Sequence, residues 1–256
     1  MIYSKNKKKV LVLLVLVFLL LASANIHSLS KNNVETAESV PRVVLLELFI
    51  QSDCNICPEV EFCLEDLFWE YGPEKIILLE EHLWSDGYDT RETNDRYDWY
   101  VTEGTKGTPD LFINGSVKRV QGLLCENLED NYYCCKKIID SELNNFSYIK
   151  ISAQKTPEDD GLAVEGKVNN VSSVILQDLA VCGMAYQDGD DPGLYYWVRD
   201  IFMFQDLPKQ FLPEDSIGYR FVSELLIPEE DRDKFHAVIF IQNLKTKEVL
   251  QAVYVE

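Results

Sequence analysis

Basic residues are scarce in this chain of 256 residues. It carries 24 Lys and Arg against 43 Asp and Glu, which gives a formal net charge of −19 at pH 7. Nucleic-acid binding needs a basic surface that follows the phosphates, so this composition argues against that class of function. Histidine is rarer still, with three copies, and a Ser-His-Asp hydrolase is therefore disfavoured.

The chain also lacks an apolar segment of about 20 residues, the length that spans a bilayer. The apolar run at residues 10–21 is shorter, follows Lys5, Lys7, Lys8 and Lys9, and precedes Ala22-Ser23-Ala24. This pattern predicts a secretory signal peptide over residues 1–24. The alternative is an uncleaved N-terminal anchor, which would be the chain's means of membrane attachment. Either way we expect the rest of the chain outside the cytoplasm (secreted, periplasmic or on the cell surface), where disulfides persist.

Two further absences concern metals. Beside the C-x-x-C pair Cys54 and Cys57, the adjacent Cys134 and Cys135 do not supply the second C-x-x-C of a structural zinc site. The acidic loop that starts at Gln187 lacks the closing Glu of an EF-hand and is interpreted as a turn. A structural zinc site and an EF-hand are therefore not expected, and no bound cofactor is expected either.

Apolar periodicity predicts an α/β domain over residues 41–147, preceded by a polar linker over residues 25–40. The predicted order of elements is β-α-β-α-β-β-α. The expected strands are residues 43–49, 75–81, 111–113 and 117–120, with a hairpin turn at Asn114-Gly115, and the expected helices are residues 58–71, 90–101 and 126–143.

Residues 148–256 change to short strand-like runs separated by Pro, Gly and Asp turns. The runs are residues 148–154, 161–168, 173–186, 195–204, 218–227, 235–243 and 248–255. Apolar and polar residues alternate in the first two, as they do in half-buried strands. We therefore predict an antiparallel, immunoglobulin-like β-sandwich as a second domain, in which no chemical motif is visible.

A combination of motifs indicates a family for the first domain. Cys54 and Cys57 stand at the start of the first predicted helix, and the stretch GTPDLFING places Thr108-Pro109 before the third strand. With the element order, these motifs make residues 41–145 resemble the thioredoxin superfamily, and most of all its exported members. The chain departs from the cytosolic reductase in having no Trp before Cys54 and no Gly-Pro inside the pair. The resemblance implies that Pro109 is cis and that Thr108 and Pro109 form a substrate ledge facing the dithiol.

The resemblance and the position of the cysteines predict a thiol-disulfide oxidoreductase that acts on cysteines of exported proteins. Unpaired N–H groups at a helix start favour a Cys54 thiolate as nucleophile, and the more buried Cys57 would resolve the mixed disulfide. A membrane thiol-disulfide electron donor is a second expected partner. Glu47 lies on the strand that precedes the pair; the resemblance implies that it relays the proton of Cys57, and the alternative is a rim carboxylate.

Local charge bears on the direction of electron flow. No Lys or Arg lies between Val43 and Lys75. Negative charge disfavours a thiolate, whereas a strong oxidant needs its thiolate stabilised. We therefore expect a reductase or isomerase rather than an oxidase, unless Lys106 or Arg91 folds against the site. The acids near the pair in sequence are Glu47, Asp53, Glu59, Glu61 and Glu65.

Three other interpretations stay open. The C-x-x-C pair can be a structural disulfide. The thioredoxin-like domain can be a scaffold in a surface binding or assembly protein whose sandwich carries the interaction. His82, expected at the C-terminal end of the second strand, can join Cys54 and Cys57 as a copper ligand, as in thioredoxin-like copper chaperones, or be a hydrogen-bonded structural histidine.

The other cysteines suggest a link between helices. Cys63 lies on an apolar helix face, and we expect a disulfide from it to Cys134 or Cys135, although buried thiols or a bond involving Cys125 are alternatives. Seven cysteines is an odd number, so at least one thiol stays free in a monomer, and Cys182 is the best candidate. Sequons occur at Asn114, Asn145 and Asn170.

Overall fold

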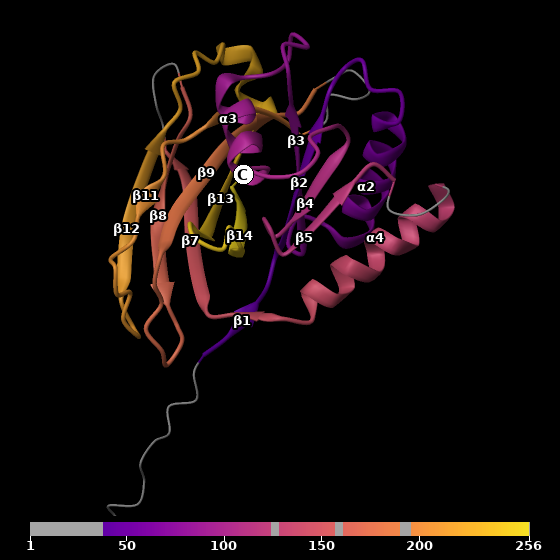
Figure 1. Cartoon of the computed structure of the whole chain (residues 1–256). Helices are drawn as coiled ribbons and strands as arrows, with labels where there is room; N and C mark the ends of the chain where they lie inside the picture. Colours follow the sequence, from indigo (N-terminus) through magenta and orange to yellow (C-terminus); the bar gives the residue numbers. More distant parts are fainter. Residues whose placement is uncertain (1–37, 124–127, 157–160, 190–195, 256) are drawn as a thin grey trace, which may run out of the picture. The chain divides into compact units, whose positions relative to one another are not determined.

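The computed structural model describes residues 38–123, 128–156, 161–189 and 196–255 (Figure 1). The predicted signal peptide, nearly all of the predicted linker, and Cys125 lie outside these residues. In the part of the chain that is described, no helix combines the length and the apolar character that crossing a membrane requires.

The first part of the chain has the predicted order of strands and helices, each close to its expected bounds. Along the chain they are β2 (Val44–Ile50), α2 (Cys57–Tyr71), β3 (Ile76–His82), α3 (Arg91–Tyr100), β4 (Asp110–Ile113), β5 (Lys118–Gln121) and α4 (Leu128–Leu143). β2 and β3 are parallel, whereas β4 is antiparallel to both β2 and β5. The resulting strand order is β3-β2-β4-β5.

Alternate side chains of β2 pack on opposite faces of this sheet. Leu46 and Leu48 belong to a buried cluster that includes residues of α2 and α4. Phe49 belongs to a smaller cluster with Tyr97 and Tyr100 of α3. The helices α2 and α4 therefore cover one face of β2–β5, where Figure 1 shows them together, and α3 covers the other.

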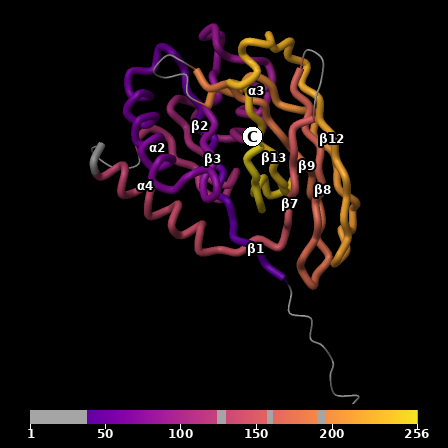
Figure 2. The backbone as a smooth tube through the Cα atoms, turned by 180° about the vertical axis from the view of Figure 1, so that it is seen from behind, coloured from indigo at the N-terminus to yellow at the C-terminus, as the bar shows by residue number. Residues whose placement is uncertain are grey.

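Each strand-like run of the second half contains a strand. These strands are β7 (Ile149–Thr156), β8 (Ala163–Asn170), β9 (Leu179–Gln187), β10 (Trp197–Ile201), β12 (Ser216–Val222), β13 (Phe235–Asn243) and β14 (Val249–Val255). β12, β8 and β7 form a separate sheet, in which Figure 2 shows β8 and β12 side by side. A second buried cluster draws on this sheet and on β9 and β13, so the second half is built of two β layers.

Short elements without a clear sequence pattern complete the fold. They are the two-residue strands β1 (Val40–Pro41), β6 (Phe146–Ser147) and β11 (Gln205–Asp206) and the 3-10 helix η1 (Glu229–Lys234). β1 pairs with β6, which ties the segment before β2 to the segment after α4.

The two halves share a single sheet, a feature that no local sequence pattern predicts. β10 pairs in parallel with β3 at Trp197 and Glu80, so the order β14-β13-β9-β10-β3-β2-β4-β5 is continuous. The first buried cluster accordingly includes Met184 and Phe240 of the second half. The domain boundary between residues 147 and 148 stays a prediction, and both the sheet and the core run across it.

The turn between β4 and β5 is docked on the turn between β13 and β14. The N–H of Val249 donates to the carbonyl of Asn114 at 3.0 Å, and the N–H of Ser116 donates to the carbonyl of Lys247 at 3.1 Å. Gly115 has a φ of +64°, and a Cβ there would overlap the Lys247 carbonyl oxygen. The predicted Asn-Gly turn is therefore required by this close approach as well as by the hairpin.

A buried ion pair joins α3 to β2 where the two halves meet. Arg96 Nε lies 2.5 Å from Oε1 of Glu47, whose side chain is fully buried. Tyr100 donates to the other Glu47 oxygen at 2.8 Å, and Gln242 of β13 donates to the Tyr100 hydroxyl at 2.7 Å. Burial alone would lower the pKa of Arg96, but the negative charge of Glu47 raises it. The guanidinium therefore stays charged and compensates a carboxylate that water does not reach.

Arg96→Leu is expected to destabilise the protein by about 3–5 kcal/mol, because it leaves Glu47 buried without a counter-charge. Arg91→Leu is the matched control on the same helix. Its partner Asp95 and Arg91 itself are exposed, and a surface pair contributes at most about 1 kcal/mol. Urea unfolding of both variants measures the difference, and equal midpoints would contradict the role given to Arg96.

Candidate functional site

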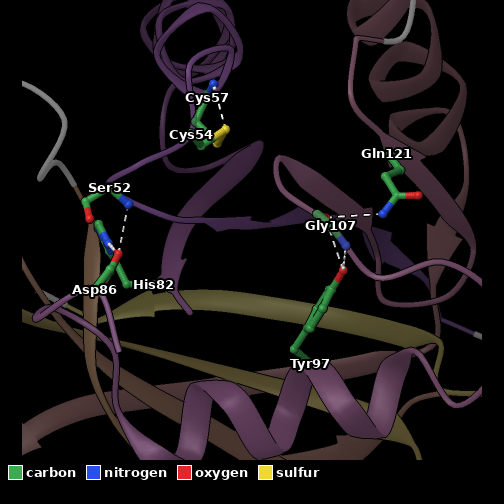
Figure 3. The surroundings of a disulfide bond; sticks show 8 residues. All are labelled: Ser52, Cys54, Cys57, His82, Asp86, Tyr97, Gly107 and Gln121. Carbon is green, nitrogen blue, oxygen red and sulfur yellow. Dashed lines mark hydrogen bonds and ion pairs between the residues drawn. A yellow bond between two sulfur atoms is a disulfide. The ribbon is translucent and has the colours of Figure 1, made fainter. Parts of the chain in front are cut away.

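Cys54 and Cys57 form a disulfide at the start of α2 (Figure 3). α2 begins at Cys57 and carries Pro58 in its first turn, a position where the missing N–H has no helical partner to lose. The N–H of Cys57 donates to Cys54 Sγ at 3.1 Å, so a helix N-terminal donor already contacts the sulfur that would carry charge after reduction. Cys57 is 1% exposed, whereas Cys54 is half-buried. A second molecule can therefore reach one sulfur of the pair.

The Thr108–Pro109 turn lies at the same edge of the sheet as the disulfide. The peptide bond between these residues is cis. The pairing of Phe49 with Asp110 places Pro109 opposite Ile50, from which the chain runs on to Cys54. Pro109 is buried, whereas Thr108 is half-buried. The part of this turn that a second molecule can reach is therefore the segment that precedes Pro109.

Two neighbouring elements hold the turn in place. The N–H of Gly107 donates to the Tyr97 hydroxyl of α3 at 3.0 Å, and Gln121 Nε2 donates to the Gly107 carbonyl at 3.2 Å (Figure 3). The Tyr97 hydroxyl in turn donates to buried Asp110 at 2.8 Å, and Arg119 pairs with the same carboxylate. The backbone before Pro109 is thus fixed from α3 and from the end of β5.

Asp86 ties the loop after β3 to the loop that carries the disulfide. Its Oδ2 accepts the N–H of Ser52 at 3.0 Å and lies 2.6 Å from His82 Nδ1, as Figure 3 shows. Its Oδ1 accepts the N–H groups of Tyr88 and Asp89 at 2.9 and 3.1 Å. Burial would raise the pKa of Asp86, but the hydrogen bonds from His82, Tyr88 and Ser52 lower it. Asp86 is therefore ionised at neutral pH.

His82 lies at the C-terminal end of β3, as predicted, and is a hydrogen-bonded residue of the core. Its side chain is buried, and its ring centroid lies 5.2 Å from that of Tyr88 and 6.2 Å from that of Trp197. Its Nδ1 is committed to Asp86. Among the described residues, no group of three or more His, Cys, Asp or Glu side chains is arranged to hold a metal ion.

The structure does not bring Glu47 to the disulfide. Its oxygens contact Arg96 and Tyr100 of α3, whereas Cys57 packs in the cluster on the α2 face of the sheet. Full burial of the Glu47 side chain also removes the interpretation as a rim carboxylate. The proton relay predicted at Glu47 therefore has no support in the geometry.

Two other carboxyl groups lie on the α2 side: Glu61, which the sequence placed among the acids near the pair, and Glu80, which it did not single out. Glu61 follows Cys57 by one helical turn, a spacing that puts both on one helix face, and it is 7% exposed. Burial, followed by the charge of Glu65, raises the pKa of Glu61 to about 7. Glu80 of β3 is fully buried, and its pKa is raised well above the ordinary value by burial and by the charges of Glu61 and Glu65. A carboxyl group that titrates near neutrality thus stands close to the buried cysteine.

The remaining cysteines correct one prediction. Cys63, Cys135 and Cys182 are buried free thiols, so the predicted disulfide from Cys63 to Cys134 or Cys135 is wrong. The thiols of Cys63 and Cys135 lie next to each other, which lowers the pKa of Cys63 and raises that of Cys135, and Cys134 is disulfide-bonded. Helical phase therefore predicted the right neighbours without the bond. Cys182 is free, as predicted, and burial raises its pKa to about 12, so it is inert.

Comparisons with known proteins show a shared fold only. No protein-family model matches the chain, and no curated protein matches it in sequence. The solved structure of HBP35 of Porphyromonas gingivalis has a TM-score of 0.65 at 12% identity, over 84% of this chain and 75% of that one. A domain of the outer membrane lipoprotein Omp28 from Porphyromonas gingivalis has a TM-score of 0.31 at 16% identity, over 43% of this chain and 88% of that one. The first similarity indicates the fold alone, and the second is too low to support an argument.

Glu61 predicts a pH dependence of stability. Its pKa is raised from 4.5 to about 7, so the folded state binds more protons than the unfolded state between these values, and stability falls as the pH rises through this window. Glu61→Gln should remove that fall and stabilise the protein near pH 8 by at most about 3 kcal/mol, with no effect near pH 4. Unfolding across this range, with half-buried Glu59→Gln as control, measures the effect. A Glu61→Gln curve parallel to that of the parent protein would contradict it.

Proposed function

We propose that this protein is an exported thiol-disulfide oxidoreductase of the thioredoxin superfamily that acts on cysteines of other exported proteins. The observation that carries the proposal is the Cys54–Cys57 disulfide at a helix start, with one reachable sulfur, at the same sheet edge as the Thr108–Pro109 turn. The element order from β2 to α4 supports the thioredoxin-like assignment. The signal-like pattern of residues 1–24 and the disulfide at Cys134 support an extracytoplasmic location.

In the reduced protein, Cys54 is the nucleophile. Its thiolate attacks one sulfur of a substrate disulfide, and the other sulfur leaves as a thiolate that takes up a proton. Cys57 then loses its proton and attacks the Cys54 sulfur, which releases the second substrate thiol and restores the Cys54–Cys57 bond. Two electrons pass to the substrate, and a membrane thiol-disulfide donor must replace them. No bound cofactor takes part.

Residues next to the disulfide bind the substrate and accept the proton of Cys57. The backbone of Gly107 and Thr108, held by Tyr97 and Gln121, is the ledge on which an extended substrate lies. Glu61 accepts the proton of Cys57, because a carboxyl group with a pKa of about 7 is suited to general base catalysis at neutral pH. This role replaces the one first assigned to Glu47.

Local charge favours a reductase or isomerase over an oxidase. Lys106 pairs with Asp98 and Arg91 pairs with Asp95, so both cations that would stabilise a Cys54 thiolate have other partners. The acids next to the disulfide in sequence, such as exposed Asp53, oppose the helix N-terminus. The reduced pair is therefore not stabilised as a strong oxidant requires.

Trapping of mixed disulfides tests the enzymatic function. Cys57→Ser should accumulate mixed disulfides with other exported proteins, because Cys54 is reachable and its resolving thiol is gone. Cys54→Ser should accumulate none, because Cys57 is buried. Cys182→Ser controls for the loss of a thiol elsewhere. Non-reducing electrophoresis and mass spectrometry identify the adducts. If neither Cys57→Ser nor Cys54→Ser forms mixed disulfides, the scaffold alternative is favoured, in which the interaction lies on another surface.

Thiolate absorbance against pH tests the direction of electron flow. The reduced protein is compared with Cys54→Ser, so that the difference reports Cys54. We expect this difference to titrate near the range of ordinary thioredoxin-like reductants. A Cys54 that stays ionised below about pH 5 would contradict the argument from local charge.

A further inference from the structure

We infer that the loop of residues 83–89 selects the substrate, and that it selects polypeptide segments with an aromatic or apolar side chain and positive charge beside the reacting cysteine. This inference deepens the proposed function and rests on it. It starts from three large, partly covered apolar side chains, one in the segment that carries the disulfide and two in the loop bonded to that segment through Asp86 and Ser52: Ile56 is 39%, Trp84 39% and Tyr88 38% exposed.

Trp84 lies between the two parts of the site. The N–H of Leu83 donates to the carbonyl of Ile50 at 3.0 Å, so the loop starts where β2 turns toward the disulfide. The ring of Trp84 packs edge-on against Tyr97, with centroids 5.7 Å apart, and Tyr97 holds Gly107 in the turn before Pro109. An extended chain on this turn with its cysteine at Cys54 would therefore place neighbouring side chains over Trp84.

The loop is held in one conformation that costs backbone energy. Trp84 and Ser85 have φ values of 62° and 61°, in the left-handed region that non-glycine residues avoid. Asn94 of α3 accepts the N–H of Trp84 at 3.0 Å, and Asp86 holds Ser52 and Tyr88. Strain that persists because many contacts enforce it is concentrated at functional sites. A large exposed side chain in such a conformation is presented to a second molecule.

The second half of the chain fixes the far end of the same loop. Trp197 Nε1 of β10 donates to the carbonyl of Tyr88 at 2.8 Å, and the two rings lie 5.3 Å apart. The Arg199 guanidinium lies over the Trp197 ring at 3.9 Å from its centroid. Trp197 is therefore a positioning residue for the substrate surface.

Charge identifies the occupant as basic. Between residues 44 and 90, Lys75 is the one Lys or Arg, and it follows α2 at the end far from the disulfide. Arg199 of β10 is the cation that the second half brings near the loop, and it is stacked on Trp197. Asp53 is exposed, and Glu59 and Asp89 are half-buried. A cysteine-containing segment of an unfolded or partly unfolded polypeptide, with Lys or Arg and an aromatic side chain near the cysteine, complements both the apolar surface and this charge.

Four short peptides test the inference with the full reduced protein. Each carries one cysteine as a disulfide with thionitrobenzoate and is flanked by Phe and Lys, Phe and Glu, Gly and Lys, or Gly and Glu. Attack by Cys54 captures the peptide and releases thionitrobenzoate, which is read by absorbance. We expect the Phe and Lys peptide to react about tenfold faster than the Gly and Glu peptide, and added salt to reduce the preference for Lys.

Variants assign the preference to the loop. Trp84→Asn should lose the preference for Phe, and asparagine tolerates the left-handed backbone of this position. Tyr88→Ser repeats the test inside the loop without that backbone constraint, and Ile56→Ser tests the side chain that precedes α2. Trp197→Phe keeps the ring but removes the donor to Tyr88, and should reduce the preference for Phe in part. Trp69→Ala is the matched control, since Trp69 is 76% exposed near the other end of α2.

The outcomes separate this inference from the function on which it rests. Equal rates for all four peptides, with normal reaction of glutathione disulfide, would overturn the role of the loop and leave the oxidoreductase in place. A preference for Phe that survives in both loop variants, Trp84→Asn and Tyr88→Ser, would do the same. Absence of reaction with every disulfide, small or peptide, would overturn the proposed function itself.

Discussion

The position of α3 depends on the buried pair of Arg96 and Glu47. A carboxylate in the middle of β2 is tolerated because the guanidinium reaches it at 2.5 Å, and this contact fixes α3 against the sheet. From α3, Tyr97 then reaches Gly107 before the Pro109 turn, and Tyr100 reaches Gln242 of β13. One compensated charge thus controls both the edge of the sheet that holds the disulfide and the contact between the two halves.

Continuity of the sheet gives the second half a part in the site without any catalytic group of its own. The pairing of Trp197 with Glu80 leaves the Trp197 side chain beside Tyr88, in the loop that follows β3. A sandwich attached by a flexible linker could not hold that loop from its own strand. The two halves are therefore better regarded as one scaffold, in which the β-rich half sets the shape of the surface around the disulfide.

Periodicity predicted most of the strands and helices, because each type of element spaces its apolar residues in a characteristic way. Part of the site was also predicted from the sequence. Cys54 and Cys57 were found from the C-x-x-C spacing, and the Thr108–Pro109 turn was singled out through the resemblance to the thioredoxin superfamily. The parallel pairing of β10 with β3 leaves no local pattern, so the shared sheet was not predictable. The proton relay at Glu47 came from the resemblance alone, and the alternation of β2, which separates Glu47 from Leu46 and Leu48, was not used to place its side chain on the α3 face. Glu61 was detectable, since it interrupts the apolar face of α2 one turn after Cys57.

The docking of the β4–β5 turn has a consequence for chemical ageing. Asn-Gly is the dipeptide most prone to deamidation, in which the glycine nitrogen attacks the asparagine side chain to form a cyclic imide. Here the Asn114 amide is buried, accepts the N–H of Leu45 and donates to Glu142. The next peptide unit is fixed against Lys247.

The same burial makes the Asn114 sequon inaccessible to a glycosyltransferase once the chain has folded, whereas Asn145 stays exposed. Asn114 is thus protected from both modifications as long as the protein stays folded. Deamidated Asn114 would therefore identify molecules that had unfolded.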